Sequence, residues 1–250
     1  MSGLAGRLAS FLGRRCQACG AAFRHGGPED VEAGESARLL CPDCRVLLAP
    51  RLAGFCPACG LPFADASADP YLCGPCRSAP RPWRNFAWHG PYQGLLGQLL
   101  REFKFTARLG LSRVLATLAR EAWERAPQDG AAPDLVVPVP LHPRRLAERG
   151  FNQSLLLAGG LKPLPGLAFD PGALVRLRDT APQARLDGAE RRDNLRGAFA
   201  ADPGRVEGRG VVLVDDVMTT GGTLEEATLA LIRAGARSVD VLVVARTARE

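Results

Sequence analysis

More than any other segment, the stretch that begins at Val211 limits what this chain can fold into. Val211 to Val214 is apolar, and three of its four residues are β-branched, which is typical of a short strand covered on both faces of a parallel sheet. Thr223 and Glu226 match a capping box that opens a helix, and Val239 to Ala245 supplies another apolar strand. Residues 211–245 therefore predict a β-α-β unit, and we expect an α/β fold: a mostly parallel sheet with flanking helices.

The turn between this strand and the predicted helix suits a phosphate group. Gly221 and Gly222 allow the backbone to turn tightly with its N–H groups facing inward, and a helix N-terminus favours negative charge. Hydroxyl groups at positions 219, 220 and 223 add donors. The chain has neither a G-x-x-x-x-G-K-[ST] loop nor a G-x-G-x-x-G turn that opens a helix after a strand. The segment therefore predicts a phosphate site of another kind.

Two adjacent carboxylates, Asp215 and Asp216, stand between the strand and this turn. In a regular strand they would point to opposite faces, so both can serve one ligand only if the chain is already turning there. They would repel a phosphate unless they face another part of the ligand, such as vicinal hydroxyls or a metal ion. A ribose 5-phosphate satisfies both requirements. The alternative is that the acidic pair belongs to a helix-capping turn and has no ligand.

These residues resemble the phosphoribosyl-pyrophosphate (PRPP) signature of the type I phosphoribosyltransferases. The resemblance implies that Asp215 and Asp216 hold the ribose 2′ and 3′ hydroxyls, that the following turn holds the 5-phosphate, and that Mg²⁺ accompanies PRPP. It leaves open both the acceptor and whether the protein is an enzyme. The PRPP-binding residues that it implies are Asp215, Asp216, Met218, Thr219, Thr220, Gly221, Gly222 and Thr223.

Two arginine-rich segments could meet a second anionic group. Leu135 to Pro140 reads as a short buried strand that enters a rigid loop, and Arg144 and Arg145 would follow at the strand's carboxyl end, where ligands of open α/β sheets bind. We expect these two arginines to join the aspartate pair in catalysis, and a solvated loop is the alternative. We expect His142 to be structural rather than a general base. Residues 176–199 suit either a flap that closes over pyrophosphate or a salt-bridged surface helix.

The chain's eight cysteines form four C-x-x-C pairs, all in its first third. This pattern predicts two zinc sites with four cysteine ligands each, and four thiolates leave no open coordination position, so both sites should be structural. Disulfides are the competing explanation, but nothing like a secretory signal precedes the cysteines. Tandem pairing is preferred over an interleaved cross-brace, although the sequence does not decide between them. The eight predicted ligands are Cys16, Cys19, Cys41, Cys44, Cys56, Cys59, Cys73 and Cys76.

A proline-rich link at residues 78–82 marks a predicted boundary. We expect a double zinc ribbon module with a short N-terminal helix over residues 1–80 and a phosphoribosyltransferase-like domain over residues 81–250. The formal charge of +6 invites a nucleic-acid function. Eight thiolates and two Zn²⁺ would lower it to about +2, so charge alone does not predict DNA binding. No apolar run reaches the length of a membrane span.

Four features together resemble the ComF family of competence-type proteins, which includes GntX-like members. They are the cysteine pairs, the V-P-V-P-L-H-P-R-R run with R-G-F-N-Q-S, the R-x-R-D-T-x-x-Q segment and the D-D-V-x-T-T-G-x-T loop. The resemblance covers Cys16 to about Arg246. It implies a double zinc ribbon, a phosphoribosyltransferase-like domain and a role in DNA uptake. It also implies a cytoplasmic location, peripheral to the inner membrane through partners such as an uptake helicase or channel components.

Two functions remain open at this point. The first is an Mg²⁺-dependent transferase in which a nucleophile attacks the ribose C1′ as pyrophosphate departs, its acceptor site formed by residues 81–110 or the zinc module. The second is a non-catalytic module that binds single-stranded DNA and takes PRPP as a regulatory ligand. In the second, Trp83 and Trp88 would stack on bases beside Arg81 and Arg84. We favour the alternative that these aromatic rings pack the domain junction.

Overall fold

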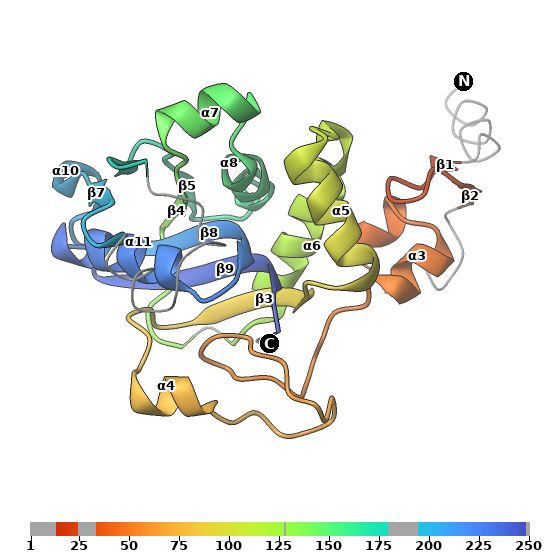
Figure 1. The fold of residues 1–250 in the computed structure, drawn as a ribbon, viewed down its shortest axis with the longest axis horizontal. Coiled ribbons are helices and arrows are strands. Elements are labelled where there is room, and N and C mark those ends of the chain that lie inside the picture. The colour runs from red at the N-terminus through yellow and green to blue at the C-terminus, as the bar shows by residue number, and fades with distance from the viewer. Residues whose placement is uncertain (1–13, 25–33, 128, 180–194, 249–250) are drawn as a thin grey trace.

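A five-stranded, wholly parallel sheet forms the centre of the computed structural model, which describes residues 14–24, 34–127, 129–179 and 195–248 (Figure 1). The predicted α/β class is confirmed. The strands, in their order across the sheet, are β3 (Phe86–Pro91), β9 (Ser238–Arg246), β8 (Gly210–Met218), β4 (Leu135–Pro138) and β5 (Ala168–Phe169).

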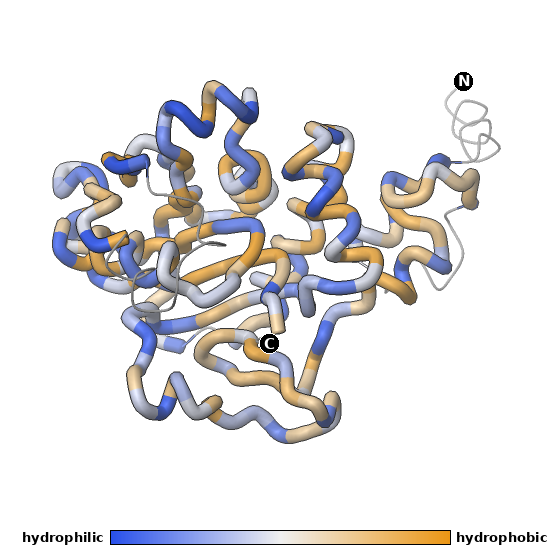
Figure 2. The backbone as a smooth tube through the Cα atoms, in the orientation of Figure 1, coloured by the Kyte–Doolittle hydropathy of each residue, from blue (hydrophilic) through white to orange (hydrophobic). Residues whose placement is uncertain are grey.

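The two central strands are apolar because neither has a solvent face. In β8, Val211 and Leu213 pack into the core on one side of the sheet, and Val212 and Val214 pack into the core on the other. All four are 0% exposed. Figure 2 shows the same concentration of hydrophobic residues along β8 and β9. Burial on both faces explains the continuous apolar run, since a half-exposed strand would alternate with polar residues.

Helices cover both faces of the sheet. One face carries α5 (Gly94–Phe105), α6 (Ser112–Arg125) and α8 (Gln153–Ala158). The opposite face carries α11 (Gly222–Arg233) and the antiparallel pair β6 (Leu174–Arg176) and β7 (Phe199–Ala201). The remaining elements of this part are η2 (Leu109–Leu111), α7 (Pro143–Arg149), η3 (Gly159–Leu161) and α10 (Pro203–Val206).

The two cysteine-bearing segments join different halves of the core. The first contains β1 (Arg14–Arg15), β2 (Ala22–Phe23), η1 (Glu35–Arg38) and α3 (Pro42–Leu47), and its buried residues belong to the core half of α5 and α6. The second contains α4 (Gly74–Ser78) and packs with Trp83, Phe86 and Trp88 in the other half. Figure 1 shows α3 beside α5 and α4 below β3. The boundary at residue 80 stays a prediction, and the expected N-terminal helix lies outside the described residues.

A buried ion pair joins Arg84, just before β3, to Asp240 of β9. The Arg84 guanidinium donates to both oxygens of Asp240, at 2.9 and 2.6 Å, and the backbone N–H of Asn85 donates to the same carboxylate at 3.1 Å. The Asp240 side chain is 0% exposed, and that of Arg84 is 25% exposed. This carboxylate therefore depends on Arg84 for its charge compensation.

Arg84→Ala should lower the free energy of unfolding by about 2–3 kcal/mol, because it leaves a buried carboxylate without its cation. The measurement is urea denaturation followed by circular dichroism. Arg233→Ala is the matched control: it removes an ion pair with Glu226 from a side chain that is 57% exposed, and should cost less than about 1 kcal/mol. Equal losses in both variants would contradict the assignment.

Candidate functional site

The loop after β8 requires glycine at Gly221. This residue has a φ of +96°, and a Cβ there would lie 2.6 Å from Cε of Met218. Helix α11 begins at Gly222 with Gly221 as its N-cap, and no side chain caps this end. The predicted capping box is therefore wrong: Thr223 already lies inside the helix, because the left-handed turn at Gly221 starts it two residues earlier than a Thr223 cap would allow.

The predicted phosphate-binding residues line this turn. Met218 is buried beneath it, Gly221 is buried, Thr219 is exposed, and Thr220, Gly222 and Thr223 are half-buried. The backbone of residues 219–222 thus approaches the surface at the N-terminus of a 12-residue helix. Such a terminus favours an anion.

Both carboxylates face the helices of one side of the sheet. The Ser154 hydroxyl of α8 donates to Oδ1 of Asp215 at 2.7 Å, and Nζ of Lys104 in α5 lies 3.1 Å from Oδ2 of Asp216. The side-chain alternation of β8 also reverses here, since Val217 packs on the α5 side and Met218 on the α11 side. The strand continues to Met218 and stays paired with β9, so the chain does not yet turn at the acidic pair, but the broken alternation lets both carboxylates face the same side.

The acidic pair carries more negative charge than its surroundings neutralise. Burial and the neighbouring Asp216 charge raise the pKa of Asp215 to about 6, although the Ser154 hydroxyl and Lys104 act in the opposite direction. Asp216 is 3% exposed and has Lys104 as its cation. Two carboxylates thus share one lysine. The arrangement suits a ligand that donates hydrogen bonds or brings a cation.

The sequence predicted that Arg144 and Arg145 lie in the loop after the strand, and this placement is wrong. They occupy the first turn of α7, which starts with Pro143 at its first position and is capped by His142, whose Nδ1 accepts from the Arg144 N–H at 3.3 Å. The structure thus gives His142 the structural role that we expected. Proline at the first helical position and a capping side chain explain why a helix forms here.

The side chains of both arginines reach Asp179. Arg144 Nη1 lies 3.4 Å from Oδ2 and Arg145 Nε lies 3.7 Å from Oδ1 of that carboxylate, and the Arg144 side chain is 72% exposed. Arg176, at the end of β6, connects this group to the acidic pair by charge: burial and Arg145 lower its pKa, whereas Asp215 and Asp179 raise it. Arg144, Arg145 and Arg176, which we call the basic group, thus face the same region as Asp215. Residues 180–194, which include most of the predicted flap, lie outside the described residues.

Sequence reasoning missed three residues of this site: Lys104, Ser154 and Arg176. Lys104 had a signal, because lysine is rare in this arginine-rich chain. Ser154 belongs to the R-G-F-N-Q-S run and Arg176 to the R-x-R-D-T segment. Nothing in those runs indicates which side chain meets an aspartate more than thirty residues away.

The cysteines form two separate groups in tandem order, which confirms the preferred pairing. In each group the four sulfur atoms lie within 4.8 Å of one another, and two of the pairs, Cys19 with Cys41 and Cys59 with Cys73, are 3.8 and 3.7 Å apart. All eight cysteines are free of disulfides. The two distances match the edge of about 3.8 Å expected for a tetrahedron of sulfurs at about 2.3 Å from a metal. Each group can therefore hold one metal ion with no open position.

Thiolate character also favours a metal in the second group. A hydrogen bond from Cys59 lowers the pKa of Cys56 to about 4, even though burial opposes this. The same contact raises the pKa of Cys59. The two thiols thus hold their protons unequally, and a metal ion would favour the thiolate form of all four cysteines.

Two arginines join the second cysteine group to the loop after β8. Arg81 donates from Nε to the Cys76 sulfur at 3.4 Å and pairs with Glu225 in the first turn of α11. Arg246, 1% exposed, donates to the carbonyl oxygens of Cys59 at 3.2 Å and Met218 at 3.3 Å. The loop is therefore held directly by the residues around this cysteine group.

The aromatic residues of this region are packed inside. Trp83 and Trp88 are 5% and 6% exposed, and Nε1 of Trp83 donates to the Ala58 carbonyl at 2.8 Å. Trp88 also makes an edge contact with Phe55. The prediction that these rings stack on DNA bases is wrong, and the favoured alternative of a packed junction is confirmed.

Comparisons with known proteins agree with this architecture. A family model described as Phosphoribosyl transferase domain matches residues 172–250. The DNA utilization protein YhgH of Salmonella typhimurium is 38% identical over 83% of this chain and 90% of its own length, and Competence protein F of Haemophilus influenzae is 32% identical over 76% and 85%.

Among solved structures, the B. subtilis glutamine phosphoribosylpyrophosphate amidotransferase complexed with ADP and GMP is 25% identical, with a TM-score of 0.37, over 57% of this chain and 30% of that one. The described residues contain no helix with the length and apolar character of a membrane span. Matched along most of its length by relatives named for DNA utilization and competence, and carrying two four-cysteine groups on a phosphoribosyltransferase-type sheet, the chain belongs to the ComF family.

Proposed function

We propose that this protein binds PRPP at the carboxyl end of β8 and acts in DNA uptake or utilisation as a phosphoribosyltransferase-like protein. The observation that carries the proposal is the placement of Asp215 and Asp216 on one side of the sheet, directly before a glycine turn at the N-terminus of α11. One half of the site accepts hydrogen bonds and the other half attracts an anion. The names of the relatives, which refer to DNA utilization and competence, support this cellular role.

Each part of the ligand has a matching group in this proposal. Asp215 and Asp216 would accept hydrogen bonds from the ribose 2′ and 3′ hydroxyls. The turn from Met218 to Thr223 would hold the 5-phosphate through backbone N–H groups and threonine hydroxyls. Bound Mg²⁺ would neutralise charge on the pyrophosphate.

If the protein turns over, the reaction is a displacement at the ribose C1′. A bond forms between C1′ and the acceptor, and the bond from C1′ to the pyrophosphate oxygen breaks with its electron pair leaving on pyrophosphate. Lys104 and the basic group of Arg144, Arg145 and Arg176 would stabilise the departing charge. The acceptor is the part that this site leaves open.

The cysteine groups suggest zinc and a reducing compartment. All eight cysteines are thiols, and four sulfurs per group without other ligands are typical of structural zinc. We propose residues 1–80 as a double zinc ribbon module and a cytoplasmic location. Components of a DNA-uptake helicase or channel would be its partners at the inner membrane.

The first prediction concerns the aspartate pair. Calorimetric titration of the metal-replete protein with PRPP and Mg²⁺ should give saturable binding. Asp215→Asn combined with Asp216→Asn should weaken it at least tenfold, because the ribose hydroxyls lose their charged acceptors, worth about 1.5–3 kcal/mol each. Glu207→Gln, which changes an exposed carboxylate elsewhere, is the control. Absence of PRPP binding in the parent protein would refute the proposed function.

The second prediction is a dependence of stability on pH. The pKa of Asp215 rises from 3.8 to about 6 on folding, so the folded chain binds an extra proton between these values and loses stability as pH rises through them. Asp215→Asn should therefore stabilise the protein by roughly 1–2 kcal/mol at pH 7.5, after allowance for partial exposure, and by almost nothing at pH 3.5. Urea denaturation at both values measures this.

Asp134→Asn is the opposite control for this measurement. Burial would raise the pKa of Asp134, but the hydrogen bonds from Arg209 and the Gly210 N–H, together with the charges of Arg209 and Arg237, lower it overall. This substitution should therefore destabilise the protein at pH 7.5. A loss of stability in both variants would mean that Asp215 is structurally paired rather than electrostatically strained.

The third prediction concerns the metal. Elemental analysis should find two zinc ions per chain, since each group of four sulfurs holds one. Removing both with a chelator should lower the melting temperature by more than 10 °C, because structural zinc contributes on the order of 10 kcal/mol to folding. Readdition of zinc should restore the original transition. A chain that purifies without metal and melts at the same temperature with and without chelator would contradict this assignment.

A further inference from the structure

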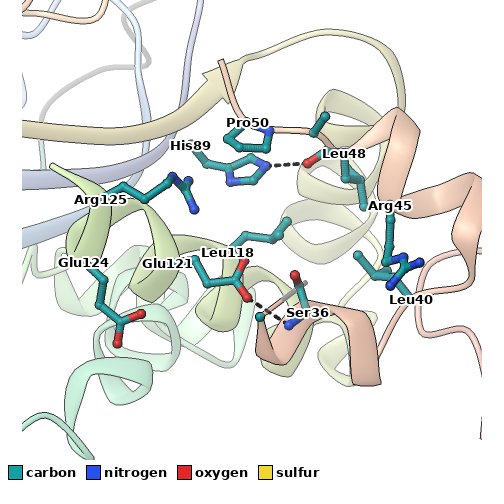
Figure 3. A pocket seen from close by; sticks show the side chains of 12 residues that line it. Ser36, Leu40, Arg45, Leu48, Pro50, His89, Leu118, Glu121, Glu124 and Arg125 are labelled. Carbon is teal, nitrogen blue, oxygen red and sulfur yellow. Dashed lines mark hydrogen bonds between the residues drawn. The ribbon is translucent and has the colours of Figure 1, made fainter. Parts of the chain in front are cut away.

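A cavity of about 450 Å³ lies between the first cysteine segment and the edge of the sheet. Residues 34–50 form one wall, and β3 and α6 form the other (Figure 3). This volume is typical of small-molecule sites. None of the lining residues belongs to the candidate PRPP site. The apolar part of the lining is made by Leu40, Leu48, Pro50 and Leu118.

His89 presents an unused hydrogen-bond acceptor to this cavity. The side chain is 2% exposed, and its Nε2 lies 2.7 Å from the Leu48 carbonyl oxygen. A carbonyl can only accept, so Nε2 carries the proton and Nδ1 has a free lone pair. That Nδ1 is buried and has no partner among the described residues. Burial lowers the pKa of His89 to about 4, so the ring is neutral at physiological pH.

Arg125 supplies donors beside this acceptor. Figure 3 shows its guanidinium next to the His89 ring, on the side away from Leu48. Burial lowers the pKa of Arg125, while Glu121 and Glu124 oppose the shift. Within the described ranges of the chain Arg125 makes no hydrogen bond or ion pair. The His89 acceptor and the Arg125 donors therefore lie side by side, next to the apolar residues of the cavity.

We propose that this cavity binds a small, uncharged, planar heterocycle with adjacent N–H and carbonyl groups. The ligand N–H would donate to Nδ1 of His89, Arg125 would donate to the carbonyl, and the ring would lie against Leu48 and Leu118. A bare anion is opposed by Glu121 and Glu124, and a cation by Arg45 and Arg125, which also line the cavity. A neutral lactam edge, with one N–H and one carbonyl group, is repelled by neither set of charges.

Uracil is a small probe with this edge, and 1,3-dimethyluracil keeps its ring and carbonyls but has no N–H. Calorimetric titration of the full, metal-replete chain, without PRPP, should give saturable 1:1 binding of uracil and no binding of the dimethyl compound at the same concentrations. Arg125→Gln should raise the uracil dissociation constant at least tenfold. Arg113→Gln, an exposed position on the same helix and outside the cavity lining, should leave it unchanged.

Two further variants keep the test independent of folding and of the proposed function. Ala49→Trp fills the cavity from its exposed rim and should abolish uracil binding while His89 and Arg125 stay intact. Asp215→Asn with Asp216→Asn should leave uracil binding unchanged, which separates this cavity from the PRPP site. Failure of uracil to bind, equal binding of both compounds, or an unaltered Arg125→Gln variant would each overturn the proposal. In the first case an ordered water satisfies His89.

Discussion

The pairing of β8 between β9 and β4 is the interaction on which the rest of the structure depends. This strand has no solvent face, and the two halves of the core meet across it. Its register decides which helix each side chain meets, because a slip of one residue would exchange the two faces. Where the alternation reverses, after Val214, the strand can present both aspartates to α5 and α8. The packing of β8 in the centre of the sheet thus determines how the two aspartates are placed at the end of the strand.

The acidic pair and the turn behind it divide the site by charge. Carboxylates with one lysine stand on one side, and an N-terminal helix end stands on the other. The arrangement disfavours the ionised form of Asp215, since this carboxyl group is held near a like charge in a partly buried position. Such a disfavoured charge is common where binding requires it, and the buried sheet beneath supplies the stability that tolerates it.

Much of this architecture could be predicted from the sequence, for reasons that are visible in particular residues. Val211 to Val214 form the buried strand that their continuous apolar run predicts, because such a run needs cover on both faces. The cysteine spacing predicted two groups of four cysteines, and the structure has both groups. The start of α11 was predicted two residues too late, since the left-handed backbone at Gly221 that begins the helix appears only in three dimensions. The contacts of Lys104 and Ser154 with the aspartates were equally out of reach, because helix packing creates them.

The position of Arg246 has a consequence for how the molecule responds to its surroundings. This one side chain donates to the backbone beside a sulfur of the second cysteine group and to the backbone beneath the glycine turn, and Arg81 makes a parallel connection through Cys76. Oxidation of the second cysteine group would therefore also remove a support of that turn. The first cysteine group lies on the other side of the sheet, beside the His89 cavity, and none of the contacts described above joins it to the turn. Damage to the two groups would thus be felt at different places in the molecule.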